Sequence, residues 1–162
     1  MVHYIIFDIE TTGLSYNTHR ITEIGAVALK YDSGKLYETA KKFFSRTNYG
    51  SGKSDDQVAS DLQAWVESIS TGQLYGTSYN IKFDHMFLDQ EPWAVGDYLG
   101  WDIDGCVMQL TREALGLKSS LKLCNALATF GIEFDETRLH GALYDAEKAS
   151  ELMLAIVNEG MI

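Results

Sequence analysis

The chain has 162 residues, 46% of them hydrophobic, and its 23 acidic against 13 basic residues give a formal net charge of −10. This length and apolar content predict a single domain over residues 1–162, with a core that needs no disulfides. The negative charge argues against a surface that coats nucleic acid non-specifically. Because there is neither an apolar run of about 18 residues nor an N-terminal leader pattern, we expect a cytoplasmic protein without a membrane partner.

Strand patterns fill the first part of the chain. An apolar run at residues 5–14 indicates a first strand that gives way to a turn at Thr12 and Gly13. Residues 21–30 and 36–45 indicate two further strands, joined by an Asp-Ser-Gly sequence that is typical of hairpins. The three strands together predict an antiparallel meander.

Helical patterns dominate after the third strand. Ser54 and Gln57 form a candidate capping box, and apolar residues then recur at helical spacing up to Ile69. A fourth strand is expected at residues 74–79. The order of strands and helices predicts an α/β domain with a mixed sheet. Further helices are expected at residues 81–88, 106–115, 119–130 and 142–158.

Two carboxylates lie near the end of the first strand. Side chains two positions apart share one face of a strand, so Asp8 and Glu10 point the same way as Ile6, and Phe7 and Ile9 point the other way. Burying two like charges side by side is costly without a counter-charge. A hard divalent cation such as magnesium or manganese, which binds carboxylate oxygens, is the simplest counter-charge.

Two more acids are expected to point inward from helices. Asp84 and Asp145 each lie on the apolar face of a helix, and all four acids can meet at one end of the sheet. Four carboxylates can hold two divalent ions roughly 3.5 to 4 Å apart, an arrangement that suits phosphodiester hydrolysis. His140 precedes the last helix, and its imidazole could take a proton from water near neutral pH.

Three segments of the chain resemble the three motifs of the DEDDh family of 3′→5′ exonucleases. They are Phe-Asp-Ile-Glu-Thr-Thr-Gly-Leu at 7–14, Asn-Ile-Lys-Phe-Asp at 80–84 and His-Gly-Ala-Leu-Tyr-Asp-Ala at 140–146. The family includes the proofreading exonucleases of bacterial replicative polymerases, ribonuclease T and oligoribonuclease. A weaker likeness runs through residues 21–27 and 120–123. The resemblance implies a ribonuclease H-like fold, a mixed five-stranded sheet of three antiparallel strands followed by parallel strands, flanked by helices.

The resemblance also implies roles for the five motif residues. Asp8 would bridge two divalent cations, Mg²⁺ or Mn²⁺, and Glu10 and Asp145 would complete the ligands of one of them. Asp84 would serve the other ion, partly through water. His140 would be the general base that activates the nucleophilic water.

Residues beside the motif acids are implied to hold the substrate. The backbone near Thr11 and Thr12 would receive the 3′-terminal nucleotide, and Leu14 would wedge against its base. Asn80 and Phe83 would line the same pocket. An apolar wedge and an aromatic face suit a single-stranded end, because stacking tolerates any base sequence.

The function expected from these motifs is a metal-dependent 3′→5′ exonuclease that releases nucleoside 5′-monophosphates from single-stranded 3′ ends, with DNA preferred. A role in DNA replication or repair, with a polymerase or other replication protein as a partner, would follow from the proofreading relatives. However, residues 46–57 lack the longer, proline-containing connection with a His-Gly-Ile element that many proofreading members carry. This departure leaves the choice of polymer open.

Three alternatives remain at this point. The first is an exoribonuclease that acts on short RNA or RNA 3′ tails, since discrimination of the 2′-hydroxyl depends on details of the pocket. The second is a non-catalytic nucleic-acid-binding domain of the same fold. The third is a phosphatase with an aspartate nucleophile, which would leave the second and third motifs unexplained.

Overall fold

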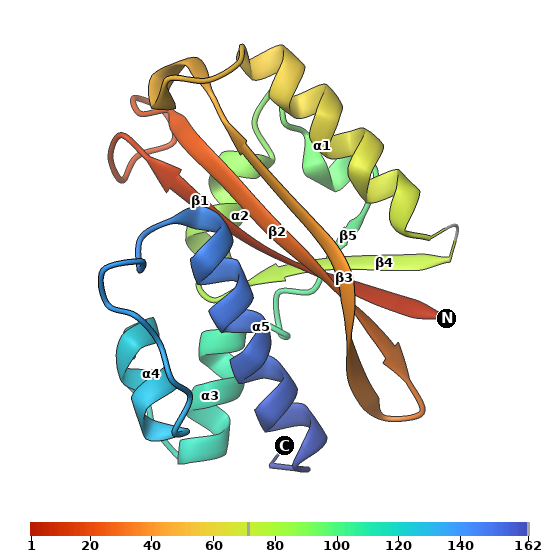
Figure 1. Ribbon diagram of the computed structural model, residues 1–162, viewed down its shortest axis with the longest axis vertical. Coiled ribbons are helices and arrows are strands. Elements are labelled where there is room, and N and C mark those ends of the chain that lie inside the picture. The colour runs from red at the N-terminus through yellow and green to blue at the C-terminus, as the bar shows by residue number, and fades with distance from the viewer. Residues whose placement is uncertain (71, 162) are drawn as a thin grey trace.

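A single mixed sheet organises the chain. The computed structural model describes residues 1–70 and 72–161, and its strands follow the order β3-β2-β1-β4-β5 (Figure 1). The first three strands, β1 (Val2–Thr11), β2 (Ile21–Asp32) and β3 (Lys35–Arg46), pair antiparallel. The next two, β4 (Gln73–Ser78) and β5 (Gly100–Trp101), run parallel to β1. The expected sheet of three antiparallel strands followed by parallel strands is confirmed.

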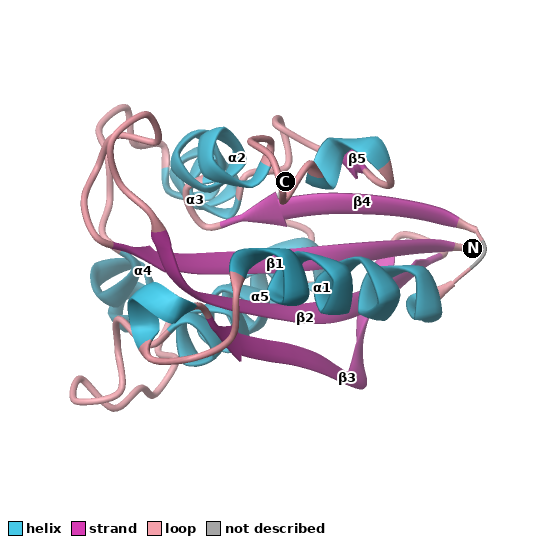
Figure 2. Ribbon diagram, turned by 90° about the horizontal axis from the view of Figure 1, so that it is seen from above, coloured by secondary structure: helices cyan, strands magenta, loops and turns pink. Residues whose placement is uncertain are grey.

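Helices cover both faces of this sheet (Figure 2). On one face lie α1 (Asp55–Ile69) and α2 (Ile81–Leu88). On the other face lie α3 (Val107–Leu115), α4 (Leu123–Thr129) and α5 (Ala142–Asn158). Two short 3₁₀ turns, η1 (Asn48–Gly50) and η2 (Val95–Asp97), complete the described elements. None of the helices in residues 1–70 and 72–161 combines the length and the apolar character that a membrane crossing requires.

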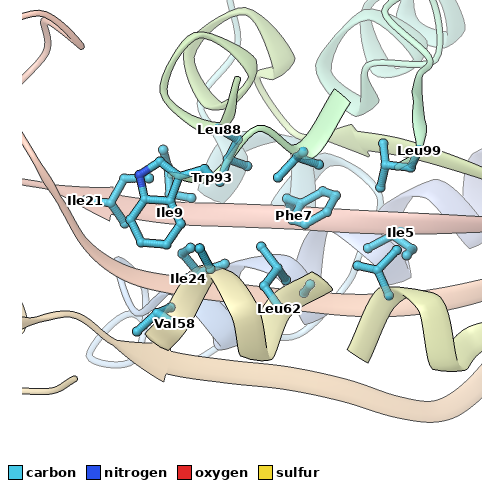
Figure 3. Packing of buried hydrophobic residues seen from close by; sticks show 14 of the residues in the cluster. Ile5, Phe7, Ile9, Ile21, Ile24, Val58, Leu62, Leu88, Trp93 and Leu99 are labelled. Atoms are coloured by element: carbon cyan, nitrogen blue, oxygen red, sulfur yellow. The ribbon is translucent and has the colours of Figure 1, made fainter. Parts of the chain in front are cut away.

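The central strand β1 divides the interior into two cores. Ile5, Phe7 and Ile9 point into the core beneath α1 and α2 (Figure 3). Ile6 points into the opposite core, where it meets residues of α3, α4 and α5. The alternation predicted for this strand is therefore confirmed. It also fixes the face to which Asp8 belongs, because Asp8 lies two positions after Ile6.

Two helix starts differ from the sequence-based expectation. At α1, Ser54 Oγ accepts from the Gln57 backbone N–H at 3.2 Å, but the Gln57 side chain bonds Asp61 instead of reaching back, so only half of the capping box forms. The helix expected at residues 119–130 begins only at Leu123, and that prediction of its start was wrong. The preceding residues are not helical, and the Tyr79 hydroxyl donates to the carbonyl of Leu121 there.

Candidate active site

Three of the predicted carboxylates meet at the end of β1. Asp8 and Glu10 come from one face of that strand, and Asp145 comes from the first turn of α5, which packs against β1 and β2. One carboxylate oxygen from each of the three residues lies within 4.8 Å of the other two. Oxygen atoms at such separations can share one hard divalent cation.

The fourth acid, Asp84, lies beside this group and is not a member of it. Asp84 is 4% exposed on α2, so it points inward as its helical face predicted. After burial, the charge of Asp84 is the next cause of the raised pKa of Asp8, so the two carboxyl groups interact electrostatically. The structure therefore brings three acids together and places the fourth next to them.

The electrostatics of the group favour a bound cation. Burial, reinforced by the charges of Asp84, Asp145 and Glu10, raises the pKa of Asp8 well above its usual range. Burial and the neighbouring Asp145 charge raise the pKa of Glu10 to about 7, and burial is the main reason that the pKa of Asp84 rises to about 8. Asp8 Oδ2 is buried and has no hydrogen-bond partner among residues 1–70 and 72–161. A buried acceptor without a donor, among hard oxygen ligands, fits Mg²⁺ or Mn²⁺.

His140 lies at the rim of the group. Its backbone N–H donates to both carboxylate oxygens of Asp145, each at 3.1 Å. This contact opposes the rise that burial causes in the pKa of Asp145. The residue has a φ of 69°, in the left-handed region, and its side chain is exposed at the edge of a cleft that also reaches Asp145. The imidazole is thus close to the carboxylates without being one of the three grouped ligands.

The loop after β1 is a closed turn with an exposed tip. The Thr11 hydroxyl donates to the carbonyl of Gly13 at 2.6 Å, and the Thr12 backbone N–H donates to the carbonyl of Arg20 at 2.9 Å. Leu14 is 86% exposed, which is unusual for a large apolar side chain. The position of Leu14 suits the predicted wedge, and its contact with a nucleotide stays a prediction.

The other two predicted substrate residues lie at the start of α2. Asn80 is exposed and precedes the helix, and its side chain makes no capping hydrogen bond. Phe83 is partly buried, with its ring 5.1 Å from that of Phe87 between centroids. Among the described residues the Asn80 amide thus does not cap the helix, and it lines the cleft that also reaches Asp145, whereas Phe83 offers only part of its ring to a ligand.

One residue of the site, Glu23, was not identified from the sequence. It lies on β2 opposite Glu10. One of its oxygens accepts from the Ala142 backbone N–H at 3.0 Å, and the other faces Arg46 Nε at 3.3 Å. Both oxygens have donors, and Glu23 is not a member of the group formed by Asp8, Glu10 and Asp145. It instead fastens the start of α5, and with it Asp145, to the sheet.

We predict that Glu23→Ala lowers kcat by about 10- to 100-fold, because supporting groups of metal ligands typically contribute this much. Loss of the helix-start acceptor should also cost about 1 kcal/mol of stability. Glu23→Gln keeps an acceptor for Ala142 and should retain most of the activity. Steady-state kinetics and melting temperatures of both variants test this, with the exposed Glu38→Ala on β3 as the control. Equal losses in the Ala and Gln variants would contradict a role through this hydrogen bond.

The raised carboxyl pKa values predict how the metal-free protein responds to pH. Between pH values near 4 and the folded-state values of about 7 for Glu10 and about 8 for Asp84, the folded protein holds protons that the unfolded chain has lost. Stability therefore falls as pH rises through this window. We expect the protein in EDTA to melt higher at pH 6 than at pH 8, by on the order of 5 °C.

Added Mn²⁺ should stabilise the protein more at pH 8 than at pH 6, because the metal competes with protons for the same oxygens. Thermal melts at the two pH values, with and without Mn²⁺, measure both effects. A metal-free protein that melts at the same temperature or higher at pH 8 would contradict the prediction.

Comparison with known proteins agrees with the geometry. No protein-family model matches the sequence. The chain is 26% identical over 175 residues to the PolC-type DNA polymerase III of Staphylococcus saprophyticus, an alignment that covers 96% of the chain but only 11% of the polymerase. It is 25% identical over 192 residues to ribonuclease T of Escherichia coli, covering 95% of the chain and 84% of that enzyme.

Solved structures of exonucleases share the fold of this chain. A complex of E. coli exonuclease I with single-stranded DNA superposes with a TM-score of 0.67 at 13% identity, over 98% of this chain and 41% of that one. The nuclease domain of 3′hExo, a DEDDh family member bound to rAMP, gives a TM-score of 0.64 at 14% identity, over 98% and 93%. Together with the sequence relatives, these confirm the expected resemblance to DEDDh exonucleases and the ribonuclease H-like fold.

Proposed function

We propose that this chain is a metal-dependent exonuclease that removes nucleotides from single-stranded 3′ ends in the 3′→5′ direction and releases nucleoside 5′-monophosphates. The observation that carries the proposal is the group of Asp8, Glu10 and Asp145, whose oxygens lie within 4.8 Å of one another. The buried Asp84 next to this group gives the fourth carboxylate that a pair of ions needs. We also propose that residues 1–162 act as one domain, since both cores share the same sheet.

Each motif residue has a proposed role. Asp8, Glu10 and Asp145 would hold one divalent cation, and Asp8 with Asp84 would hold a second, with Mg²⁺ or Mn²⁺ in both places. Bound ions of this kind neutralise the charge that develops on the attacking and leaving oxygens of a phosphodiester. His140 would accept a proton from the attacking water as a general base.

DNA is the proposed polymer. The PolC-type relative and the exonuclease I complex with single-stranded DNA support it. The exposed Leu14 offers an apolar surface to a terminal base of any identity. The PolC likeness also supports a role in DNA replication or repair, such as proofreading beside a polymerase or another replication protein. That likeness covers 11% of the polymerase, so the partner is part of the proposal.

RNA is the second candidate polymer. The likeness to ribonuclease T covers 84% of that enzyme, and the 3′hExo structure holds a ribonucleotide. Both observations favour a chain that accepts ribose at the 3′ end. The protein would then act as an exoribonuclease on short RNA or RNA 3′ tails.

Paired digestion tests both candidates. Single-stranded DNA and RNA 10-mers of equal sequence carry a 5′ label and are incubated with the protein in Mg²⁺, in Mn²⁺ and in EDTA. We expect ladders that shorten from the 3′ end, only with metal, and faster for DNA. Faster loss of RNA would replace the first candidate by the second. Intact 10-mers under all conditions, with binding retained, would identify a non-catalytic binding domain.

A further inference from the structure

A groove leads away from the carboxylates. A hollow of about 660 Å³ begins at His140 and Asp145, and a second hollow of about 490 Å³ lies beyond it along α3. The two hollows share Asn80, Met108 and Ser120 in their walls, so they lie side by side, and we refer to the pair as the groove. The residues that line the two hollows come from the start of α2, from α3 and from the segment before α4.

Three cationic side chains line this groove in succession. Lys122 borders the part near the carboxylates, and Lys82 and Arg112 border the part beyond. Both lysines are exposed, and none of the three takes part in an ion pair among the described residues. Arg112 donates to the carbonyl of Lys118, and its buried Nε has no hydrogen-bond partner in the part of the chain that the structure describes. On a chain with a net charge of −10, a row of available cations that starts at the site is a specific feature.

Apolar side chains line the same two hollows as these cations. Leu121, Leu123 and Leu139 line the near part of the groove, and Ile103, which is 53% exposed, lines the far part. A lining that combines cationic and apolar groups matches a single strand, whose phosphates need cations and whose unpaired bases need apolar surface. Two acids, Asp104 and Glu113, also border the far part, and Glu113 accepts from Gln109 at 3.3 Å. These acids reduce the electrostatic attraction between the groove and a nucleic-acid strand.

We propose that this groove binds the part of a single nucleic-acid strand that lies 5′ of the bond to be cleaved. Lys122, Arg112 and Lys82 would contact successive phosphates, and the apolar side chains of the same lining would face the bases. The proposal rests on the proposed exonuclease function, because it takes the 3′ end to lie at the carboxylates. It adds that the protein recognises several upstream nucleotides without reading their sequence.

The test compares two triple variants with equal loss of charge. In the groove variant, Lys82, Arg112 and Lys122 are replaced by Gln. In the control variant, Lys30, Lys35 and Lys41 are replaced by Gln. Lys30 lies on β2, and Lys35 and Lys41 lie on β3. Lys30 pairs with His3, at the end of β1 that is opposite to Glu10. The readout is kcat/KM for a (dT)10 strand divided by kcat/KM for the dinucleotide (dT)2, which lacks the upstream nucleotides. Melting temperatures confirm that both variants fold.

We expect this ratio to fall at least 10-fold in the groove variant and to stay within twofold of wild type in the control. The plot of log binding constant against log salt concentration for (dT)10 should also become less steep. Three lost phosphate contacts reduce its slope by about 2, at about 0.7 per phosphate of a single strand. An unchanged ratio in the groove variant would overturn the proposal.

A binding measurement separates this proposal from the proposed function. Fluorescence anisotropy of labelled (dT)10 is measured in EDTA, where no metal-dependent cleavage takes place. If the wild-type protein hydrolyses neither substrate, the exonuclease function is wrong, and the anisotropy still decides on the groove. At least 10-fold weaker binding by the groove variant than by the control supports the groove, and equal binding overturns it.

Discussion

Replacing Asp8 by Asn is expected to abolish hydrolysis and, at the same time, to raise the melting temperature of the metal-free protein. The two effects have one cause, the burial of Asp8 among like charges: burial raises its pKa most, and Asp84, Asp145 and Glu10 raise it further. An amide is a poorer ligand for a divalent cation, so the loss of transition-state stabilisation should reach about 4 kcal/mol, which corresponds to about a 1,000-fold loss of rate.

The same substitution removes one like charge from a buried cluster. Relief of repulsion equivalent to one pKa unit is about 1.4 kcal/mol, and a chain of this size gains about 2 to 4 °C for each kcal/mol. We therefore expect Asp8→Asn to melt a few degrees above wild type in EDTA at pH 8, and to gain less than wild type when Mn²⁺ is added. Its stability should also depend less on pH.

The matched control is Asp32→Asn, an exposed acid at the hairpin end of β2 that should change neither activity nor stability appreciably. Activity assays and thermal melts of the three proteins complete the experiment. A variant that loses activity but melts below wild type in EDTA would mean that Asp8 is a structural residue. Activity retained within 10-fold would mean that Asp8 is not a principal metal ligand.

The parts of the site that the sequence predicts are those governed by local periodicity. The alternation in β1 assigns Asp8 and Glu10 to one face, and the apolar stripe of α5 assigns Asp145 to the face that packs on the sheet. Burial of these elements is strongly patterned, so the direction of each side chain follows from its position. For the same reason the helices α2 and α5 begin and end where they were predicted.

The parts that the sequence does not predict depend on contacts between distant segments. The role of Glu23 requires the register between β1 and β2 and the arrival of Ala142 beside it, 119 positions later in the chain. The fifth strand has only two residues, too few for a periodic pattern, so its place could not be assigned in advance. The separation of Asp84 from the other three acids is likewise a matter of tertiary packing.

Replacement of His140 is the second change with a large expected effect on activity, about 100- to 10,000-fold in kcat, the usual contribution of a general base. Metal affinity should stay within about twofold of wild type. His140 bonds Asp145 through its backbone N–H, which the substitution keeps, and the imidazole is not one of the three grouped ligands. The loss should therefore appear in the chemical step, with the carboxylate geometry preserved.

The backbone at position 140 decides which variants test this cleanly. Its φ of 69° is tolerated by Asn and His better than by most residues, so His140→Ala adds strain of about 1 kcal/mol, whereas His140→Asn should not. Both variants lack the base and should lose activity to a similar degree, while only the Ala variant melts lower. Single-turnover rates, Mn²⁺ titrations followed by thermal melts and the pH dependence of kcat measure these effects. If His140→Asn weakened Mn²⁺ binding as strongly as it lowers the rate, the imidazole would be a metal ligand, because the backbone hydrogen bonds to Asp145 survive in this variant.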